Sequence, residues 1–139
     1  MGKRRKGREL LVQALYAAEL SGQPLHDCLD DQLERRQASA ETAAFARPLA
    51  DVIAKHREAL DADVNRLLDH WDPDRVGNVE RAIFRLAIAE LRHCPEVPPS
   101  VVINEACEVA RLFCDEDAVR FVNGLLDRAA REMAKAEPK

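Results

Sequence analysis

The first eight residues carry a dense cluster of basic side chains, a residue type that can bind phosphate. Five of these eight positions are lysine or arginine and none is acidic. Over the whole chain 25 acidic residues outnumber 21 basic ones, so positive charge is concentrated at one end of an acidic protein. Arginine also forks onto phosphate oxygens and stacks on nucleobases. The cluster therefore predicts binding of a polyanion such as RNA through Lys3, Arg4, Arg5, Lys6 and Arg8.

The spacing within this cluster determines how it could be presented to a ligand. In a helix that begins by Arg4, the side chains of Arg4, Arg8, Leu11 and Leu15 lie along one stripe. The guanidinium groups would then sit just beyond the apolar face and could be held against a phosphate track. A disordered, solubilising N-terminus is the alternative for the same residues.

The other chemistry-bearing residue types show no pattern typical of an enzyme. The sequence lacks a G-x-G-x-x-G loop, a Walker loop, a G-x-S-x-G elbow and an H-E-x-x-H motif. The acidic runs 30–31 and 115–117 have no companion histidine or lysine at a telling spacing. His26, His56 and His70 fall in polar helical segments, where we expect exposed or capping roles. The sequence thus predicts a protein that is not an enzyme and needs no cofactor.

The cysteines fit core packing better than metal binding. None of the four is part of a C-x-x-C pair, and a core of this size needs no disulfide. Cys107 and Cys114 are seven residues apart, and His93 precedes Cys94, but no arrangement supplies four ligands at a familiar spacing. We expect neither a bound metal nor a disulfide from Cys28, Cys94, Cys107 and Cys114.

An all-α fold is favoured by composition and by apolar periodicity. Hydrophobic residues make up 47% of the chain and aromatic residues only 4%, a balance typical of helices rather than of β-sandwiches or barrels. We expect one domain over 1–139, with 1–8 a basic arm or helix start and 135–139 a frayed tail. Apolar spacing predicts helices near residues 3–20, 25–37, 40–55, 59–68, 78–91, 102–113 and 115–133, with a possible break near residue 56.

Several local signals refine these elements. Ser39 and Asn78 are good N-caps for the helices that follow them. Apolar residues on almost every side of 79–91 predict a central, buried helix. The proline-rich stretch 94–100 predicts a stiff, extended connection. No apolar stretch is long enough to span a bilayer and no leader peptide precedes the first helix, so we expect a soluble, cytoplasmic protein.

Three positions have a predicted packing role. We expect Trp71, which precedes a break at a proline, to close the end of the helical bundle. Phe113 completes an apolar stripe that begins at Val102 and predicts a buried helix face. Gly124 interrupts the last helix, which indicates a close approach there by another helix or by a ligand.

Five blocks follow one another along the chain, namely Arg8-Glu9, Val12–Tyr16, Val79–Arg85, Val102–Ala106 and Phe121–Asp127. In their order and spacing they resemble the signature blocks of the NusB family of transcription antitermination proteins. The resemblance implies an all-helical fold of about seven helices in two small bundles packed together. It also implies a role in processive transcription of ribosomal RNA operons, with NusE, a small-subunit ribosomal protein, as partner on boxA-type RNA within the transcription elongation complex.

The resemblance also implies roles for single residues. The arginine-rich start matches the family's RNA-binding motif at Arg4, Arg5, Lys6 and Arg8, and Phe121 is a candidate for the RNA-facing surface. Residues matching positions associated with partner binding are Tyr16, Glu80 and Asp117.

Other functions fit the same sequence. Region 26–74 matches the family only in helical character, and Cys114-Asp115 stands where many relatives carry a glycine. The chain could instead be a detached RNA-binding domain that works with an RNA-modifying enzyme, or a protein–protein scaffold, and it could form a homodimer. An RNA titration with and without NusE separates these alternatives.

Overall fold

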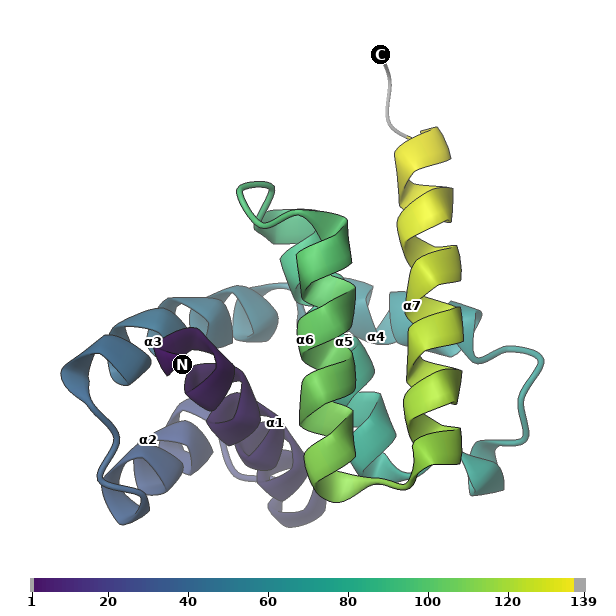
Figure 1. Cartoon of the computed structure of the whole chain (residues 1–139). Coiled ribbons are helices and arrows are strands. Elements are labelled where there is room, and N and C mark those ends of the chain that lie inside the picture. The colour runs from purple at the N-terminus through teal and green to yellow at the C-terminus, as the bar shows by residue number, and fades with distance from the viewer. Residues whose placement is uncertain (1, 137–139) are drawn as a thin grey trace.

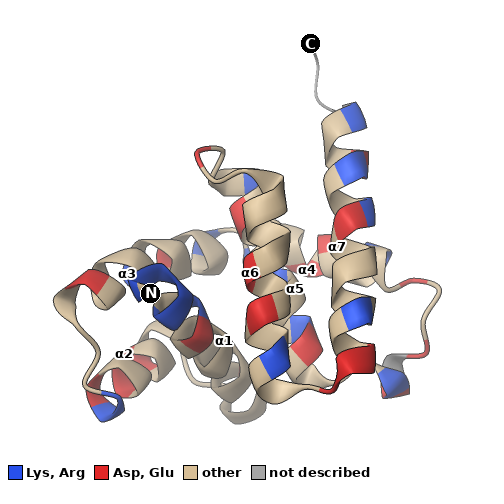
Figure 2. Ribbon diagram, viewed as in Figure 1, with Lys and Arg blue, Asp and Glu red and all other residues tan. Residues whose placement is uncertain are grey.

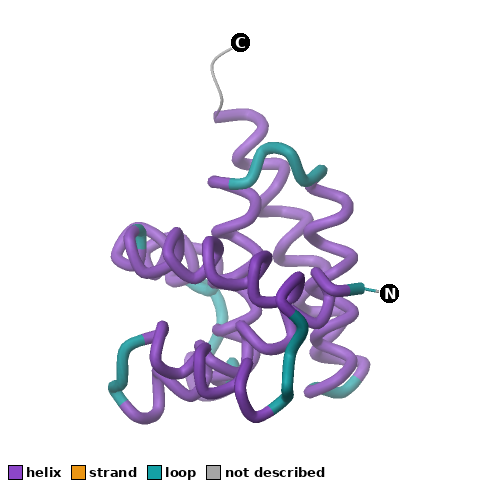
Figure 3. Tube along the Cα trace, turned by 90° about the vertical axis from the view of Figure 1, so that its left-hand side faces the viewer, coloured by secondary structure: helices purple, strands orange, loops and turns teal. Residues whose placement is uncertain are grey.

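The computed structural model describes residues 2–136, and every regular element in that range is helical (Figures 1 and 3). This confirms the all-α expectation. Residues 137–139, where the sequence predicts a frayed tail, lie outside the described part. The helices are α1 (Lys3–Ser21), α2 (Leu25–Arg35), α3 (Ala40–Lys55), α4 (Arg57–Leu67), a short 3-10 turn η1 (Pro73–Arg75), α5 (Asn78–His93), α6 (Pro99–Phe113) and α7 (Glu116–Ala136).

The helices form two groups that meet at α5. Helices α1, α2 and α3 pack on one another at one side of the molecule, and α4 to α7 form the other group (Figure 1). Helix α5 contacts α1 and α3 of the first group and α4, α6 and α7 of the second. Both groups therefore share one central helix, as the apolar residues over 79–91 predict.

Helix α5 is central because nearly all of its sides are apolar. Between Ala82 and Glu90 every residue except Arg85 is buried. The one acidic side chain buried in this stretch is that of Glu90, which is 2% exposed. A buried carboxylate requires a partner of opposite charge, so α5 imposes an electrostatic condition on the helix that packs against this point.

Helix ends agree with the sequence signals in some places and differ in others. Ser39 is the N-cap of α3 and accepts a hydrogen bond from the backbone N–H of Thr42 at 3.1 Å, as predicted. The prediction for Asn78 is wrong, because Gly77 is the N-cap of α5 and Asn78 is already helical. The side chain of Glu80 lies against Gly77, beside the first turn of the helix.

Pro99 and His56 mark two further helix boundaries. Helix α6 begins at Pro99, inside the stretch predicted to be extended, because a proline in the first turn gives up no intrahelical hydrogen bond. The possible break near residue 56 is confirmed: His56 ends α3 and precedes α4. Its ring stacks on that of His93 with centroids 4.1 Å apart, which joins the α3–α4 corner to the end of α5.

The structure alters the packing predicted for Phe113 and Trp71. Phe113 is 38% exposed, so its predicted burial is wrong; it is the last residue of α6, where the helix has passed its neighbours. Trp71 is 45% exposed and packs edge-on against Phe121 at the side of α7.

Among the described residues, no helix has the length and apolar character needed to cross a bilayer.

Gly124 is not a point of close helix approach. It lies on an exposed face of α7, and a Cβ atom added there would meet no atom within 4 Å. Of the two alternatives left by the sequence, packing against another helix of the chain is therefore removed. Gly7 in α1 is the opposite case, because an added Cβ would lie 2.7 Å from Cδ2 of Phe45.

These two glycines give a matched pair of stability predictions. Gly124→Ala should raise the free energy of unfolding by about 0.5–1 kcal/mol, because alanine costs less backbone entropy in a helix and nothing obstructs its methyl group. Gly7→Ala should lower it, since the ring of Phe45 must move. Urea unfolding followed by circular dichroism measures both, and a destabilised Gly124→Ala protein would contradict the open space described here.

Candidate nucleic-acid interface

The basic N-terminal cluster forms the first two turns of α1 and is not a disordered arm (Figure 2). Lys3 and Arg4 are exposed, and Lys6 is partly exposed with its Nζ 3.5 Å from a carboxylate oxygen of Glu9. No acidic residue stands in the first helical turn to offset this charge. Positive charge at the start of a helix adds to the positive end of the helix dipole, so this turn favours an anionic ligand.

Arg8 has a different environment from the rest of the cluster. It is 3% exposed, and its Nε and Nη2 donate to the two carboxylate oxygens of Glu90 at 2.9 and 2.7 Å. This bidentate pair joins α1 to α5 and satisfies the buried carboxylate of α5. Arg8 therefore holds the basic helix in place, and its predicted role as a phosphate contact does not fit its burial.

Arg5 is also engaged by an acidic residue. Its Nε and Nη2 donate to the two oxygens of Glu105 on α6 at 3.1 and 2.8 Å. The hydrogen bond from Arg5 lowers the pKa of the Glu105 carboxyl, outweighing the effect of its burial. Nη1 of Arg8 lies 3.6 Å from the same carboxylate. The structure thus divides the predicted cluster into accessible cations, Lys3, Arg4 and Lys6, and cations held by mostly buried carboxylates, Arg5 and Arg8.

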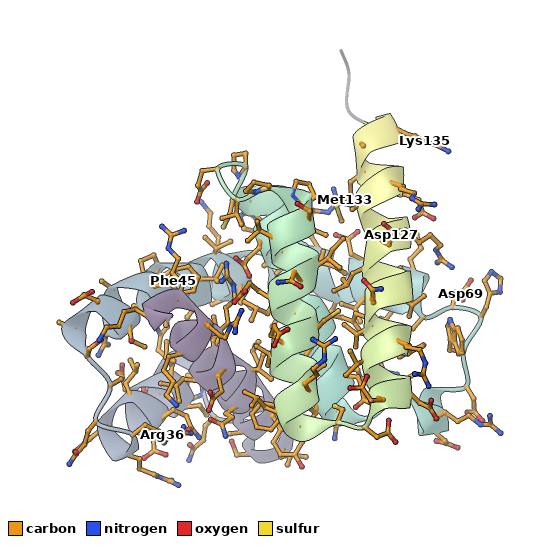
Figure 4. The ribbon with its side chains drawn as sticks, viewed as in Figure 1. Arg36, Phe45, Asp69, Asp127, Met133 and Lys135 are labelled. Atoms are coloured by element: carbon orange, nitrogen blue, oxygen red, sulfur yellow. The ribbon has the colours of Figure 1, made fainter. Side chains whose placement is uncertain are left out.

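Phe45 of α3 is a neighbour of the basic turn that the sequence analysis missed (Figure 4). The guanidinium carbons of Arg4 and Arg8 lie 5.6 and 5.0 Å from its ring centroid. Gly7, between these arginines in the helix, gives the ring its close approach to α1. Nothing in the local sequence of residues 40–55 marks this phenylalanine, since its role depends on Arg4, Gly7 and Arg8, more than 30 residues earlier in the chain.

Beside Phe45 the surface is hollowed into a groove between the start of α1, α3 and the loop after α5. Its volume is about 490 Å³. Its lining combines cations, carboxylates and apolar side chains. The lining residues include Lys3, Arg4, Glu41, Phe45, Pro48 and Glu96.

Phe121 does not lie in this basic region. It is partly exposed on α7, with its ring centroid 4.7 Å from that of Trp71 and 5.7 Å from that of Phe84. Helix α6 stands between α7 and α1 in Figure 1. An RNA contact at Phe121, the role that the resemblance implies, would therefore be separate from one at the start of α1.

The predicted partner-binding residues belong to elements that gather at one end of the molecule. Helix α1 ends, α5 begins, α6 ends and α7 begins at the lower end of Figure 1. Tyr16 is 38% exposed near the end of α1, and Asp117 is exposed in the first turn of α7, paired with Arg120. Glu80 lies in the first turn of α5, and burial together with the charge of Glu80 raises the pKa of the Cys114 thiol at the α6–α7 turn.

Exposed apolar residues accompany this end of the molecule. Leu20 and Leu112 are 60% and 58% exposed, and they stand in the last turns of α1 and α6. Apolar side chains of this size exposed beside polar ones are typical of protein-binding surfaces. We define the partner face as Tyr16, Leu20, Glu80, Leu112, Phe113 and Asp117.

The cysteines are free thiols: Cys28 lies in α2, Cys107 in α6, and Cys94 and Cys114 at the C-terminal ends of α5 and α6. Cys28 and Cys107 are buried, and burial raises the pKa of the Cys94 and Cys107 thiols. A raised pKa keeps these thiols protonated at neutral pH, the form that is poor at binding metal. The expectation that the chain binds no metal stays a prediction.

The fold and site define a small, all-helical protein with one cationic helix start and, at the other end of the same helix, a mixed polar and apolar face. The family model described as NusB family matches residues 5–131. The transcription antitermination protein NusB of Myxococcus xanthus is 37% identical, over 97% of this chain and 99% of its own length. The chain therefore belongs to the NusB family.

Solved structures agree with this assignment. NusB of T. maritima superimposes with a TM-score of 0.83 at 32% identity, covering 93% of this chain and 91% of its own. A crystal structure of the antitermination factors NusB and NusE in complex with double-stranded RNA matches with a TM-score of 0.85 at 27% identity, covering 95% of this chain and 98% of that one.

The buried Arg8–Glu90 pair generates a prediction about stability. Arg8→Met should lower the free energy of unfolding by about 3–5 kcal/mol, because it leaves the Glu90 carboxylate buried without a partner. The double variant Arg8→Met/Glu90→Met should recover most of that loss, since no buried charge remains. Urea unfolding of the two variants tests this, and a single variant as stable as the original chain would show that Glu90 finds water or another cation.

Proposed function

We propose that this protein is a transcription antitermination factor that binds boxA-type RNA together with NusE and promotes transcription of ribosomal RNA operons. Membership of the NusB family over almost the whole chain is the observation that carries the proposal. The solved complex of a related NusB with NusE and RNA supports both partners. We further propose that it acts as a single domain in the cytoplasm and has no catalytic activity.

RNA binding at the start of α1 is mainly electrostatic in this proposal. Lys3, Arg4 and Lys6 present the accessible charge, and each phosphate they neutralise releases counterions from a single strand. The groove beside Phe45 offers an aromatic edge and carboxylates next to these cations, groups that can receive an unpaired base. Because Arg8 and Arg5 fix α1 to α5 and α6, the accessible cations at the start of α1 are held in one orientation.

NusE docks on the partner face in the same proposal. The apolar residues of the partner face supply surface that becomes buried on binding. Glu80 and Asp117 supply negative charge that complements a basic surface on NusE. The RNA site and the partner face lie at opposite ends of α1, so one protein can hold both ligands at once.

The RNA proposal predicts the effect of salt on binding. Arg4→Ala/Lys6→Ala should weaken binding to a boxA-type single strand and make the log–log salt dependence shallower by about 1.4, since each lost phosphate contact removes about 0.7. Arg131→Ala/Lys135→Ala removes the same charge from the far end of α7 and should leave the slope unchanged (Figure 4). Equal slopes for all three proteins, measured by fluorescence anisotropy, would contradict RNA binding at the start of α1.

The partner proposal predicts the behaviour of Glu80→Lys. As a residue of the first turn of α5, Glu80 stabilises the helix end by about 0.3–1 kcal/mol. As part of the partner face, its reversal should also cost about 2–5 kcal/mol of NusE affinity. Glu58→Lys is the matched control, because Glu58 is an exposed first-turn acid of α4.

Calorimetric titration with NusE and thermal melting, run on both variants, separate the two roles. If Glu80→Lys and Glu58→Lys lower the melting point equally and leave NusE affinity unchanged, Glu80 only stabilises the end of its helix. RNA binding that fails with and without NusE would favour a protein–protein scaffold, and binding that depends on a methyltransferase would favour an accessory domain.

A further inference from the structure

Glu105 stands between the two paired arginines of α1. Its side chain is 13% exposed, and both of its oxygens accept hydrogen bonds from Arg5. The nearer nitrogen of Arg8 is 3.6 Å away. We call Arg5, Arg8, Glu90 and Glu105 the Arg–Glu cluster.

The charges of the Arg–Glu cluster balance. Arg8 uses its Nε and Nη2 on Glu90, and Arg5 uses the same two nitrogens on Glu105. Two guanidinium groups therefore face two carboxylates. The pKa of Glu105 is lowered, first by the hydrogen bond from Arg5, so its carboxylate is charged at neutral pH. Seen from solution, Arg5 adds little net positive charge to the start of α1.

We propose that Glu105 withholds Arg5 from RNA phosphates and so limits the strength with which the start of α1 binds any RNA. This inference rests on the proposed RNA-binding function. In this inference Glu105, a residue of α6 outside the basic cluster, determines how many cations are available to RNA.

Geometry favours retention of Arg5 by Glu105 over its transfer to a phosphate. A phosphate would have to replace a bidentate contact made by a carboxylate that is mostly removed from water. Transfer would leave Glu105 facing only Arg8, whose Nε and Nη2 are already held by Glu90. The uncompensated carboxylate would then stand close to the incoming phosphate and repel it. RNA therefore meets Lys3, Arg4 and Lys6 as accessible cations, of which Lys6 has only a 3.5 Å contact with Glu9, and it meets Arg5 as half of a neutral bidentate pair.

Two variants of the whole chain test the proposal with a short oligouridylate as probe. Glu105→Gln keeps the size of the side chain but releases the charge of Arg5, so the salt slope should steepen by about 0.7. If the variant and the original chain bind equally at about 1 M salt, this steeper slope makes the variant bind about eightfold tighter at about 50 mM salt and about threefold tighter at about 200 mM. Arg5→Gln/Glu105→Gln removes both members of the pair and should restore the original slope.

Glu132→Gln controls for the change in net charge. It removes an exposed acid that faces Arg128 at 3.3 Å on α7, away from the start of α1, and it should leave the slope unchanged. Thermal melting of each variant confirms that the proteins are folded, and a merely structural role for Glu105 would lower the melting point without steepening the slope.

The outcomes separate this inference from the proposed function. An unchanged slope in Glu105→Gln, or a slope shallower by about 0.7 in the double variant, would overturn the inference while leaving RNA binding intact. The second result would show that Arg5 contacts a phosphate in the original protein. Failure of every variant, and of the original chain, to bind RNA at low salt would overturn the proposed function and the inference together.

Discussion

The buried ion pair between Arg8 and Glu90 is the constraint on which the arrangement of the rest depends. A carboxylate enclosed in the central helix is tolerated only beside a cation, so α1 must pack where Arg8 reaches it. This requirement fixes the register of α1 on α5 and thereby joins the two groups of helices. Apolar packing supplies most of the free energy of folding, but it is less demanding about register than a bidentate pair is.

The same constraint orders the surface chemistry. With Arg8 fixed, Arg5 one turn earlier falls opposite Glu105, and Lys3, Arg4 and Lys6 turn toward solvent or the groove beside Phe45. A run of basic residues that looks uniform in the sequence occupies three distinct environments, namely a buried pair, a partly exposed pair and accessible cations. Affinity for a polyanion depends on the last group far more than on the total count of lysine and arginine.

The helices and much of their packing were predictable because they depend on local periodicity and caps. The burial of α5 follows from its apolar residues, and the N-cap of α3 follows from Ser39. The roles of Arg8 and Phe45 were not predictable locally, since each depends on a partner in a distant helix. Glu90 was the available signal: an acid inside a helix that is otherwise buried on all sides implies a basic partner elsewhere. Asn78 and Gly77 show a limit of local signals. Either neighbour can serve as the N-cap of α5, and the conformation of the turn before the helix determines that Gly77 does.

Helix α1 connects the proposed RNA site to the proposed partner face without any need for a conformational change. Its 19 residues span about 28 Å, with the accessible cations at the start and Tyr16 and Leu20 near the end. Because α1 packs on α5 and α6, the distance between the two ligands would be fixed when both are bound. A partner that carries its own affinity for RNA would then be held at a high effective concentration near the strand. Joint binding would exceed the sum of the separate affinities through geometry alone, which suits a protein whose own accessible positive charge is limited by the Arg–Glu cluster.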